Sequence, residues 1–341
     1  MPIPMVNLVE FAHTVEILDR IASPAVVNRA LHTAGVNRKM LKAGPGFVPY
    51  VVEAVFLEST ARALGDGHIG ARLGREFDYA AYRGFADYVL GARDLATALV
   101  RSRRALPLIH PGADVVLQES GDNLVIGFET GLGAVVGRRH IEEGAIFVMN
   151  SVFRHYLGAD WRPDWIDVIA DRSASGATMA DMAGAPIRGG ASLPAVSVRV
   201  ADLTALNPAP PAPEEVITLG ELPALMGVTQ PQTTEDAVRQ ILRMQLALGD
   251  LSEDSVARRL SLGPRTLQRV LKGEGTSFRN VKARFIEERA RTLLSETDLA
   301  IGDIARSIGY DEPNSFRRAF AKWTGSTPGH YRAAARQARS A

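Results

Sequence analysis

The sequence predicts an α+β domain followed by an all-α domain in which two helix-turn-helix units are joined by a long helix. Three observations support this fold class. Runs of β-branched residues typical of strands occur before a proline-rich segment at residues 207–213, and beyond residue 233 the apolar residues follow a helical period. A helix-turn-helix pattern at 260–271 returns in looser form at 308–320. The length of 341 residues also exceeds that of one ordinary domain.

Composition excludes several kinds of site and places the basic charge at one end of the chain. There is no cysteine, which excludes disulfides, thiolate zinc sites and cysteine nucleophiles. We expect a cytoplasmic protein, because the sequence shows neither a secretion signal nor an apolar run of roughly 18 residues. The net charge of +1 is unevenly distributed. There are 19 basic and 13 acidic residues from Thr233 onward, and 20 basic and 25 acidic residues before it. A basic C-terminal third is typical of a domain that faces nucleic-acid phosphates, although an ordinary basic surface would give the same count.

The N-terminal domain, residues 1–206, is predicted from mixed strand and helix patterns. Val115–Gln118 and Leu124–Phe128 flank turn residues, which predicts a β-hairpin. Further strands are expected at 166–169 and 195–200, and helices at 49–64, 93–106 and 141–156. Four prolines within 207–213 cannot support a helix or a central strand, so we expect a linker over 207–232. Within it, 216–219 has the composition of a short strand.

In the C-terminal domain, residues 233–333, cap residues and prolines predict where each helix begins. Thr233 and Asp236 form a capping-box pattern at the start of a helix that should extend to Leu248. Proline is favourable at a first helical position, where its missing N–H has no partner to lose. The further predicted starts are Ser252, Gly263-Pro264, Ser277, Asp298, Glu312-Pro313 and Thr327-Pro328. Residues 334–341 are predicted to form a basic tail.

The helix that follows Pro264 should bury one face and expose a polar one. Leu267, Val270 and Leu271 have the spacing of buried positions, whereas residues 265, 268, 269 and 272 follow i, i+3, i+4, i+7 spacing and form one stripe. Arginine suits bidentate contact with guanine, and glutamine with adenine, so this stripe predicts contact with double-stranded DNA. The candidate DNA-binding residues of this unit are Arg265, Thr266, Gln268, Arg269 and Lys272.

The second unit repeats this plan. Phe316, Ala319, Phe320 and Trp323 should face the core, and polar residues remain on the other side of the helix. The helix from Ser277 to Leu294 would span roughly 27 Å, a spacer suited to two recognition helices about one DNA turn, ~34 Å, apart. A solvated helix with exposed arginines is the alternative for either unit alone; the repeat, the spacer and the basic charge together favour DNA binding. The candidate DNA-binding residues of this unit are Asn314, Ser315, Arg317 and Arg318.

With these residues identified, the segment Ser252–Arg332 resembles the DNA-binding domain of AraC/XylS-type transcription regulators. The resemblance rests on Pro264-Arg-Thr-Leu-Gln-Arg269, Gly275-Thr-Ser-Phe278 and Trp323-Thr-Gly-Ser-Thr-Pro328. The first two motifs resemble a subgroup whose long N-terminal domain is named for arabinose binding, and residues 64–70 and 151–163 are similar to that domain.

The resemblance implies which side chains contact bases. Its base-contacting positions correspond to Arg265, Gln268 and Arg269 in the first unit, and to Asn314, Ser315 and Arg318 in the second. Two positions depart from the family pattern. Gly263 stands at a helix N-cap where the family usually has serine, and Pro313 stands where many members carry a polar side chain. Since Pro313 offers no side-chain hydrogen bond to a base, the first unit is predicted to contribute more to sequence recognition.

No motif for catalysis, metal binding or a cofactor is found. The seven histidines form no HExxH pair, and neither a G-x-S-x-G motif nor a phosphate-binding loop occurs. We therefore expect no catalytic residue, no metal and no cofactor, and a protein that is not an enzyme. Trp161, Arg162 and Trp165 are candidates for a small-molecule pocket, since aromatic residues and arginine serve that purpose, although they could equally form a packed corner.

The preferred hypothesis is a transcription regulator that binds promoter or operator DNA. Activation is favoured over repression, which makes RNA polymerase an expected partner. A small-molecule effector would bind within residues 1–206, and this part could also form a homodimer. Two alternatives stay open: an N-terminal domain that only oligomerises, and an enzyme that its C-terminal helices direct to DNA.

Overall fold

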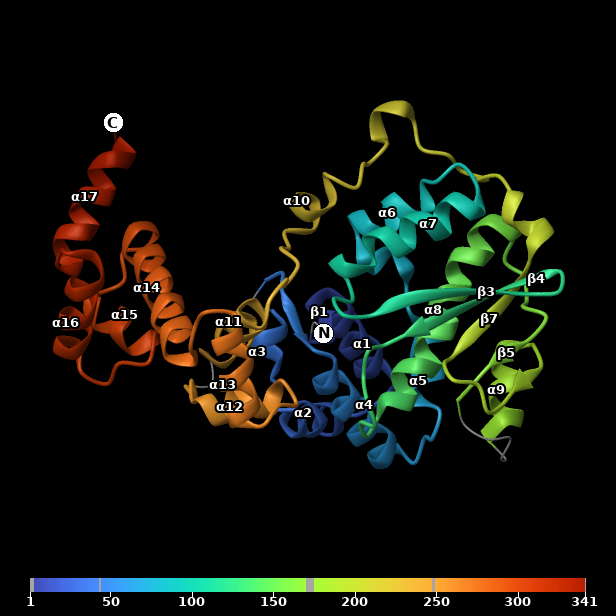
Figure 1. Ribbon diagram of the computed structural model, residues 1–341, viewed down its shortest axis with the longest axis horizontal. Helices are drawn as coiled ribbons and strands as arrows, with labels where there is room; N and C mark the ends of the chain where they lie inside the picture. Colours follow the sequence, from blue (N-terminus) through green and yellow to red (C-terminus); the bar gives the residue numbers. More distant parts are fainter. Residues whose placement is uncertain (1–2, 43, 170–174, 247–248, 341) are drawn as a thin grey trace. The chain divides into compact units, whose positions relative to one another are not determined.

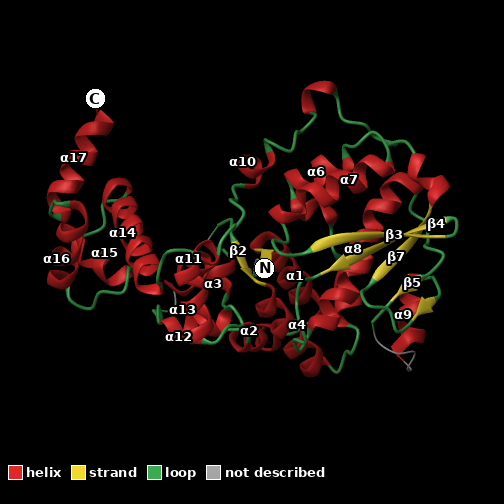
Figure 2. Cartoon of the chain, viewed as in Figure 1, coloured by secondary structure: helices red, strands yellow, loops and turns green. Residues whose placement is uncertain are grey.

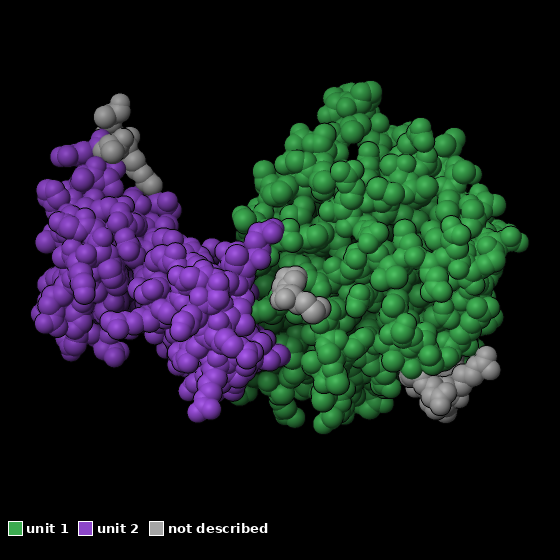
Figure 3. All heavy atoms as spheres, in the orientation of Figure 1, with its two compact units in different colours: residues 1–231 green, residues 232–341 purple. Residues whose placement is uncertain are grey.

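The computed structural model describes residues 3–42, 44–169, 175–246 and 249–340. Residue contacts divide the chain into two units, 1–231 and 232–341 (Figure 3). The first unit is α+β and the second is all-helical (Figure 2), which confirms the predicted fold class. Residues 207–231, predicted to be part of a linker, group with the first unit because α10 (Leu222–Met226) packs against α6 (Gly84–Leu90).

The main sheet of the first unit has the strand order β3-β4-β7-β5-β6. The predicted hairpin is confirmed, since β3 and β4 pair antiparallel around a turn at Gly121, whose φ of +59° suits glycine. Only the outer pair, β5 and β6, is parallel. A separate two-stranded sheet joins β1 (Met5–Asn7) to β2 (Phe47–Pro49). The five strands of the main sheet are β3 (Asp114–Ser120), β4 (Asn123–Glu129), β5 (Ile166–Asp167), β6 (Ile187–Arg188) and β7 (Ala195–Arg199).

Three predicted helices of the first unit are confirmed, and one predicted strand is wrong. The confirmed helices correspond to α4, α7 and α8, and α8 packs across β4 and β7 (Figure 1). Residues 216–219 form no strand, because the backbone N–H and hydroxyl of Thr218 donate to the Glu221 carboxylate and start the turn before α10. Besides α6 and α10, the described helices of the unit, including the three just named, are α1 (Leu8–Ile21), α2 (Pro24–Thr33), α3 (Arg38–Leu41), α4 (Tyr50–Leu64), α5 (Ile69–Glu76), α7 (Leu95–Ala105), α8 (Arg138–Leu157) and α9 (Ser175–Ala183), with short 3-10 helices η1 (Tyr79–Tyr82), η2 (Leu106–Leu108), η3 (Val200–Thr204) and η4 (Pro213–Glu215).

Glycines bring α5 and α8 into direct backbone contact, and the two helices lie side by side in Figure 1. A Cβ atom on Gly70 would lie 1.9 Å from the carbonyl oxygen of His140, and one on Gly74 would lie 2.3 Å from that of Gly144. No larger side chain fits either position without moving a helix. This contact fixes the spacing of two helices that border the interior of the first unit.

The second unit contains seven helices in its described residues. The predicted caps at Thr233, Ser252 and Ser277 are confirmed, because each side chain accepts a hydrogen bond from a backbone N–H of the first turn. The cap predicted at Asp298 is wrong: Ala300 is the N-cap residue, and Asp298 instead forms an ion pair with Arg336. The helices are α11 (Thr234–Gln245), α12 (Glu253–Arg259), α13 (Pro264–Gly273), α14 (Phe278–Glu296), α15 (Ile301–Ser307), α16 (Pro313–Thr324) and α17 (Pro328–Ser340).

The last helix extends into the segment that the sequence predicted to be a basic tail. α17 extends from Pro328 to Ser340, so the basic residues after 333 continue a helix. Two predicted limits, the end of a helix at Leu248 and the end of the tail at Ala341, lie outside the described residues.

Candidate nucleic-acid interface and ligand cavity

The two helix-turn-helix units have the same turn geometry. In the first, the backbone N–H of Leu262 donates to the carbonyl of Ala257 over 2.9 Å. In the second, the backbone N–H of Tyr310 donates to the carbonyl of Ala305 over the same distance. The repeat seen in the sequence is therefore also a repeat of backbone structure.

One residue in each turn adopts a left-handed backbone conformation. Gly309 does so in the second unit with φ +88°, where the absence of a Cβ makes this conformation accessible. The equivalent residue in the first unit is Ser261, with φ +55°. A non-glycine residue in this region is strained, so the first turn is held by the helices on both sides of it.

Apolar residues orient both recognition helices, α13 and α16. On α13, Leu267 and Leu271 are fully buried, and on α16 Phe316 and Phe320 are fully buried. The opposite faces are consequently solvent-exposed. Both helices begin with proline at the first position, as predicted.

The structure places the predicted DNA-binding residues on these outer faces. On α13 the four residues of the predicted stripe share one exposed side. On α16 the guanidinium of Arg317 donates to Asn314 Oδ1 over 3.1 Å, which holds it along the helix. The exposed residues are Arg265, Gln268, Arg269, Lys272, Asn314, Arg317 and Arg318, and Thr266 and Ser315 are half-buried.

The recognition helices differ from the other helices of this unit in the balance of charge. Neither α13 nor α16 contains an acidic residue, and none of their cations forms an ion pair with a described residue. Cations on α11, α14, α15 and α17 do form such pairs. Unpaired cations remain available for phosphates or base edges. Those of the recognition helices are Arg265, Arg269, Lys272, Arg317, Arg318 and Lys322.

The long helix α14 holds the two units in one domain. It contacts α11 and α13 as well as α15 and α17, and its 19 residues span about 28 Å. A contact that the sequence did not predict strengthens the first unit. The Glu274 carboxylate, just after α13, accepts hydrogen bonds from the backbone N–H groups of Thr234 and Glu235 at 2.8 and 3.0 Å. It thereby satisfies free N–H groups at the start of α11.

The first unit contains a cavity of about 130 Å³ between its helices and the main sheet. Helices α1, α4, α5 and α8 contribute to its wall, together with η1, α7 and strands β3 and β4. Most of the lining side chains are aliphatic or aromatic. The rings come from Tyr50, Phe77, Tyr79, Tyr82, Phe85, Phe128 and Phe153.

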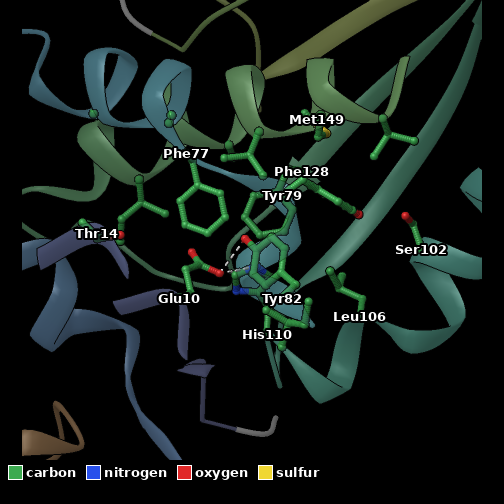
Figure 4. A pocket seen from close by; sticks show the side chains of 18 of the residues that line it. Glu10, Thr14, Phe77, Tyr79, Tyr82, Ser102, Leu106, His110, Phe128 and Met149 are labelled. Carbon is green, nitrogen blue, oxygen red and sulfur yellow. Dashed lines mark hydrogen bonds and ion pairs between the residues drawn. The ribbon is translucent and has the colours of Figure 1, made fainter. Parts of the chain in front are cut away.

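Polar groups gather at one place in this cavity, which Figure 4 shows around Glu10. Glu10 Oε2 accepts a hydrogen bond from the Tyr82 hydroxyl over 2.8 Å and lies 3.1 Å from His110 Nε2. The Tyr50 hydroxyl lies 2.9 Å from His110 Nδ1. Glu53 also lines the cavity, and its side chain is buried.

Burial sets the protonation of these groups. It raises the pKa of Glu10 to about 8, against the opposing effect of the Tyr82 hydrogen bond, and lowers the pKa of His110 to about 3. Burial, followed by the charge of Glu10, raises the pKa of Glu53 well above its ordinary value. His110 is therefore neutral at pH 7, so an Nε2–H that donates to Glu10 leaves Nδ1 to accept from Tyr50.

The three residues considered for a small-molecule pocket lie elsewhere. Among the described residues that line the cavity, none is Trp161, Arg162 or Trp165. Trp165 is buried, its Nε1–H donates to Asp167, and the guanidinium of Arg188 stacks on its ring. Trp161 packs on Phe153 with ring centroids 4.8 Å apart, and Arg162 is exposed.

Within the described part of the chain, no group of three or more histidine, aspartate or glutamate side chains is placed to hold a metal ion. No helix there is both long and apolar enough to cross a membrane.

Comparison with protein families places both units. Residues 256–334 match a helix-turn-helix domain. Residues 26–206, more than half of the chain, match the arabinose-binding N-terminal domain of AraC transcription regulators. The chain belongs to the AraC family of transcription regulators. In this AraC-family protein most residues that line the cavity lie within the segment that matches the arabinose-binding domain, while Glu10 and Thr14 precede it, and α13 to α16 lie within the segment that matches the helix-turn-helix domain.

Curated relatives resemble this AraC-family protein over shorter segments. The uncharacterised regulator YtdP of Bacillus subtilis is 39% identical over 84 residues, which are 24% of this chain and 11% of that protein. The regulator VirS of Mycobacterium tuberculosis is 34% identical over 101 residues, 30% of each chain. The chain thus spans less than a third of either relative. The crystal structure of the regulator CdpR from Pseudomonas aeruginosa aligns over 95% of this chain and 98% of that chain at 19% identity, with a TM-score of 0.42.

Proposed function

We propose that this protein is a sequence-specific DNA-binding transcription regulator whose activity a small molecule controls. One observation carries the proposal: two helix-turn-helix units share one domain, and the recognition helix of each exposes cations that have no ion-pair partner among the described residues. On α14, by contrast, Arg291 forms an ion pair with Glu287 one turn earlier. DNA phosphates would supply the missing negative charge.

The two recognition helices have different roles in this proposal. Arg265, Gln268 and Arg269 on α13 contact base edges, because they combine exposure with side chains that form bidentate contacts. On α16, Asn314 and Arg318 contact bases, while proline occupies the first position of the helix. The remaining residues of the predicted set, Thr266, Lys272, Ser315 and Arg317, contribute phosphate or supporting contacts.

The cavity of the first unit is the proposed effector site. It is largely apolar and provided with a few convergent polar groups, which are features of small-molecule sites. Effector binding would control DNA binding if the cavity differs between two conformations of the protein. We further propose that the protein acts in the cytoplasm as an activator that contacts RNA polymerase, and that the first unit can form a homodimer.

The proposal is tested by measuring DNA binding by the full-length chain. Fluorescence anisotropy with fragments of the DNA beside its own gene, in the presence of excess random competitor, should reveal one fragment that competitor does not displace. A reporter fused to that fragment should change its transcription when the protein is produced. Equal displacement from all fragments would reduce the proposal to non-specific binding, and no binding at low salt would refute it.

A further inference from the structure

The side chains that line the cavity carry acids but no permanent cation. Glu10 and Glu53 both face it, whereas no lysine or arginine occurs among its described lining residues. Its two histidines, His110 and His140, both have pKa values lowered by burial. An anionic ligand would find no cation to balance its charge in this largely apolar space and would oppose ionisation of the two carboxyl groups, whereas a cation would favour their ionised form.

Glu53 provides an independent sign of a missing partner. Its side chain is 3% exposed, and its Oε2 atom has no hydrogen-bond partner among the described residues. A buried acceptor without a donor is uncommon and destabilising, so such atoms usually have a partner in a water molecule, an ion or a ligand. Glu10 and Glu53 both line this one cavity. A donor between them would serve both.

The rest of the wall fits the body of such a ligand. The rings of Tyr79 and Tyr82 from η1 stand beside Phe77 near the carboxyl group of Glu10 (Figure 4). The faces of aromatic rings attract cations and also bury apolar groups. The volume of about 130 Å³ suits a single ring or a short chain, since an engineered cavity of about 150 Å³ admits benzene.

We propose that the effector is a small protonated amine with an apolar, preferably aromatic body, and that its ammonium group binds between Glu10 and Glu53. The ammonium offers three N–H donors, enough for Glu53 Oε2 and for Glu10, while the body lies against the rings. The inference rests on the proposed function, because it assigns the chemical class of the molecule that would control DNA binding. A carboxylate or an uncharged alcohol of the same size is the competing ligand.

Thermal denaturation of the full-length chain with three probes of matched shape tests the proposal. Benzylamine should raise the melting temperature, benzyl alcohol should bind at least about tenfold more weakly, and benzoate should leave the melting temperature unchanged. n-Butylamine separates the need for an amine from the need for a ring. The proposal is overturned if benzyl alcohol or benzoate stabilises the protein as much as benzylamine does, or if neither amine stabilises it.

Variants locate the site. Glu53→Gln and Glu10→Gln should each weaken benzylamine binding by roughly tenfold or more and remove the preference over benzyl alcohol. Glu16→Gln is the matched control, because Glu16 lies on the same helix as Glu10, is exposed and is absent from the described cavity wall. Unchanged preference in both glutamine variants overturns the proposal. If neither variant folds, the probe series on the unaltered chain decides.

DNA binding measured on the same samples separates the two proposals. Specific DNA binding without amine selectivity would overturn the ligand class and leave the regulator intact. Amine selectivity without DNA binding would overturn the regulator and leave the ligand class intact.

Discussion

Replacement of Arg269 by alanine should reduce sequence discrimination while leaving the fold intact. Arg269 lies in the second turn of α13, is exposed and forms no ion pair with a described residue, so its loss should change the free energy of unfolding by less than about 0.5 kcal/mol. A bidentate contact with guanine contributes about 1–3 kcal/mol of discrimination, which corresponds to roughly 5- to 150-fold in affinity. Binding to the preferred site should fall by this factor.

The assay compares affinities for the preferred site and for a scrambled site at one salt concentration. Lys272→Ala is the matched control, because it removes one cation from the exposed face of the same helix. We expect it to weaken binding to both DNA molecules equally and to reduce the salt dependence by about one phosphate contact. If Arg269→Ala behaves in the same way, Arg269 contacts phosphate and the assignment of base contacts to α13 is incorrect.

Three further predictions concern stability and the cavity. Ser261→Gly should raise the free energy of unfolding by about 0.5–1 kcal/mol in urea denaturation, and Gly309→Ser should lower it, since both positions have positive φ. If both substitutions changed the free energy of unfolding in the same direction, the two turns would differ in strain. Gly74→Ala, whose Cβ would lie 2.3 Å from a carbonyl oxygen of α8, should lower the free energy of unfolding by about 1–3 kcal/mol. The control Gly133→Ala adds a Cβ that meets nothing within 4 Å and should leave stability unchanged. Equal melting temperatures of the two variants would contradict the close packing of α5 and α8. Glu10 has a pKa of about 8 instead of its ordinary 4.5, so its contribution to stability is complete below about pH 4.5 and is lost as the pH rises through about 8. Urea denaturation from pH 5 to 8.5 should therefore show a smaller loss of stability in Glu10→Gln than in the unaltered chain, and parallel curves would contradict the raised pKa.

The helix-turn-helix domain could be predicted from the sequence because its determinants are local. Caps such as Thr233 and Ser277, and a proline at the start of a helix, act within one turn of the chain. The exposed stripe of α13 follows from helical spacing alone. The prediction at Asp298 was wrong because its side chain pairs with Arg336 in another helix, a long-range interaction that no local pattern reveals.

The cavity could not be predicted, since residues from distant parts of the chain form it. Glu10, Glu53 and His110 belong to three separate segments, and only the tertiary fold brings them together. Two weak signals were present in the sequence: a carboxylate at a buried position of the helix 50–64, and the Gly70-x-x-x-Gly74 spacing that permits close helix packing. Composition instead made Trp161, Arg162 and Trp165 the candidates for a small-molecule pocket, but their side chains pack on neighbouring residues or face solvent.

Selection of preferred sequences from random duplex DNA by the full-length protein tests the central claim most directly. Two recognition helices on one rigid domain predict an asymmetric site with two enriched blocks about 10 base pairs apart. The block that Arg269→Ala relaxes should contain guanine. The account would be contradicted if no sequence were enriched. It would also be contradicted if a single block were enriched and substitutions in neither recognition helix changed that block.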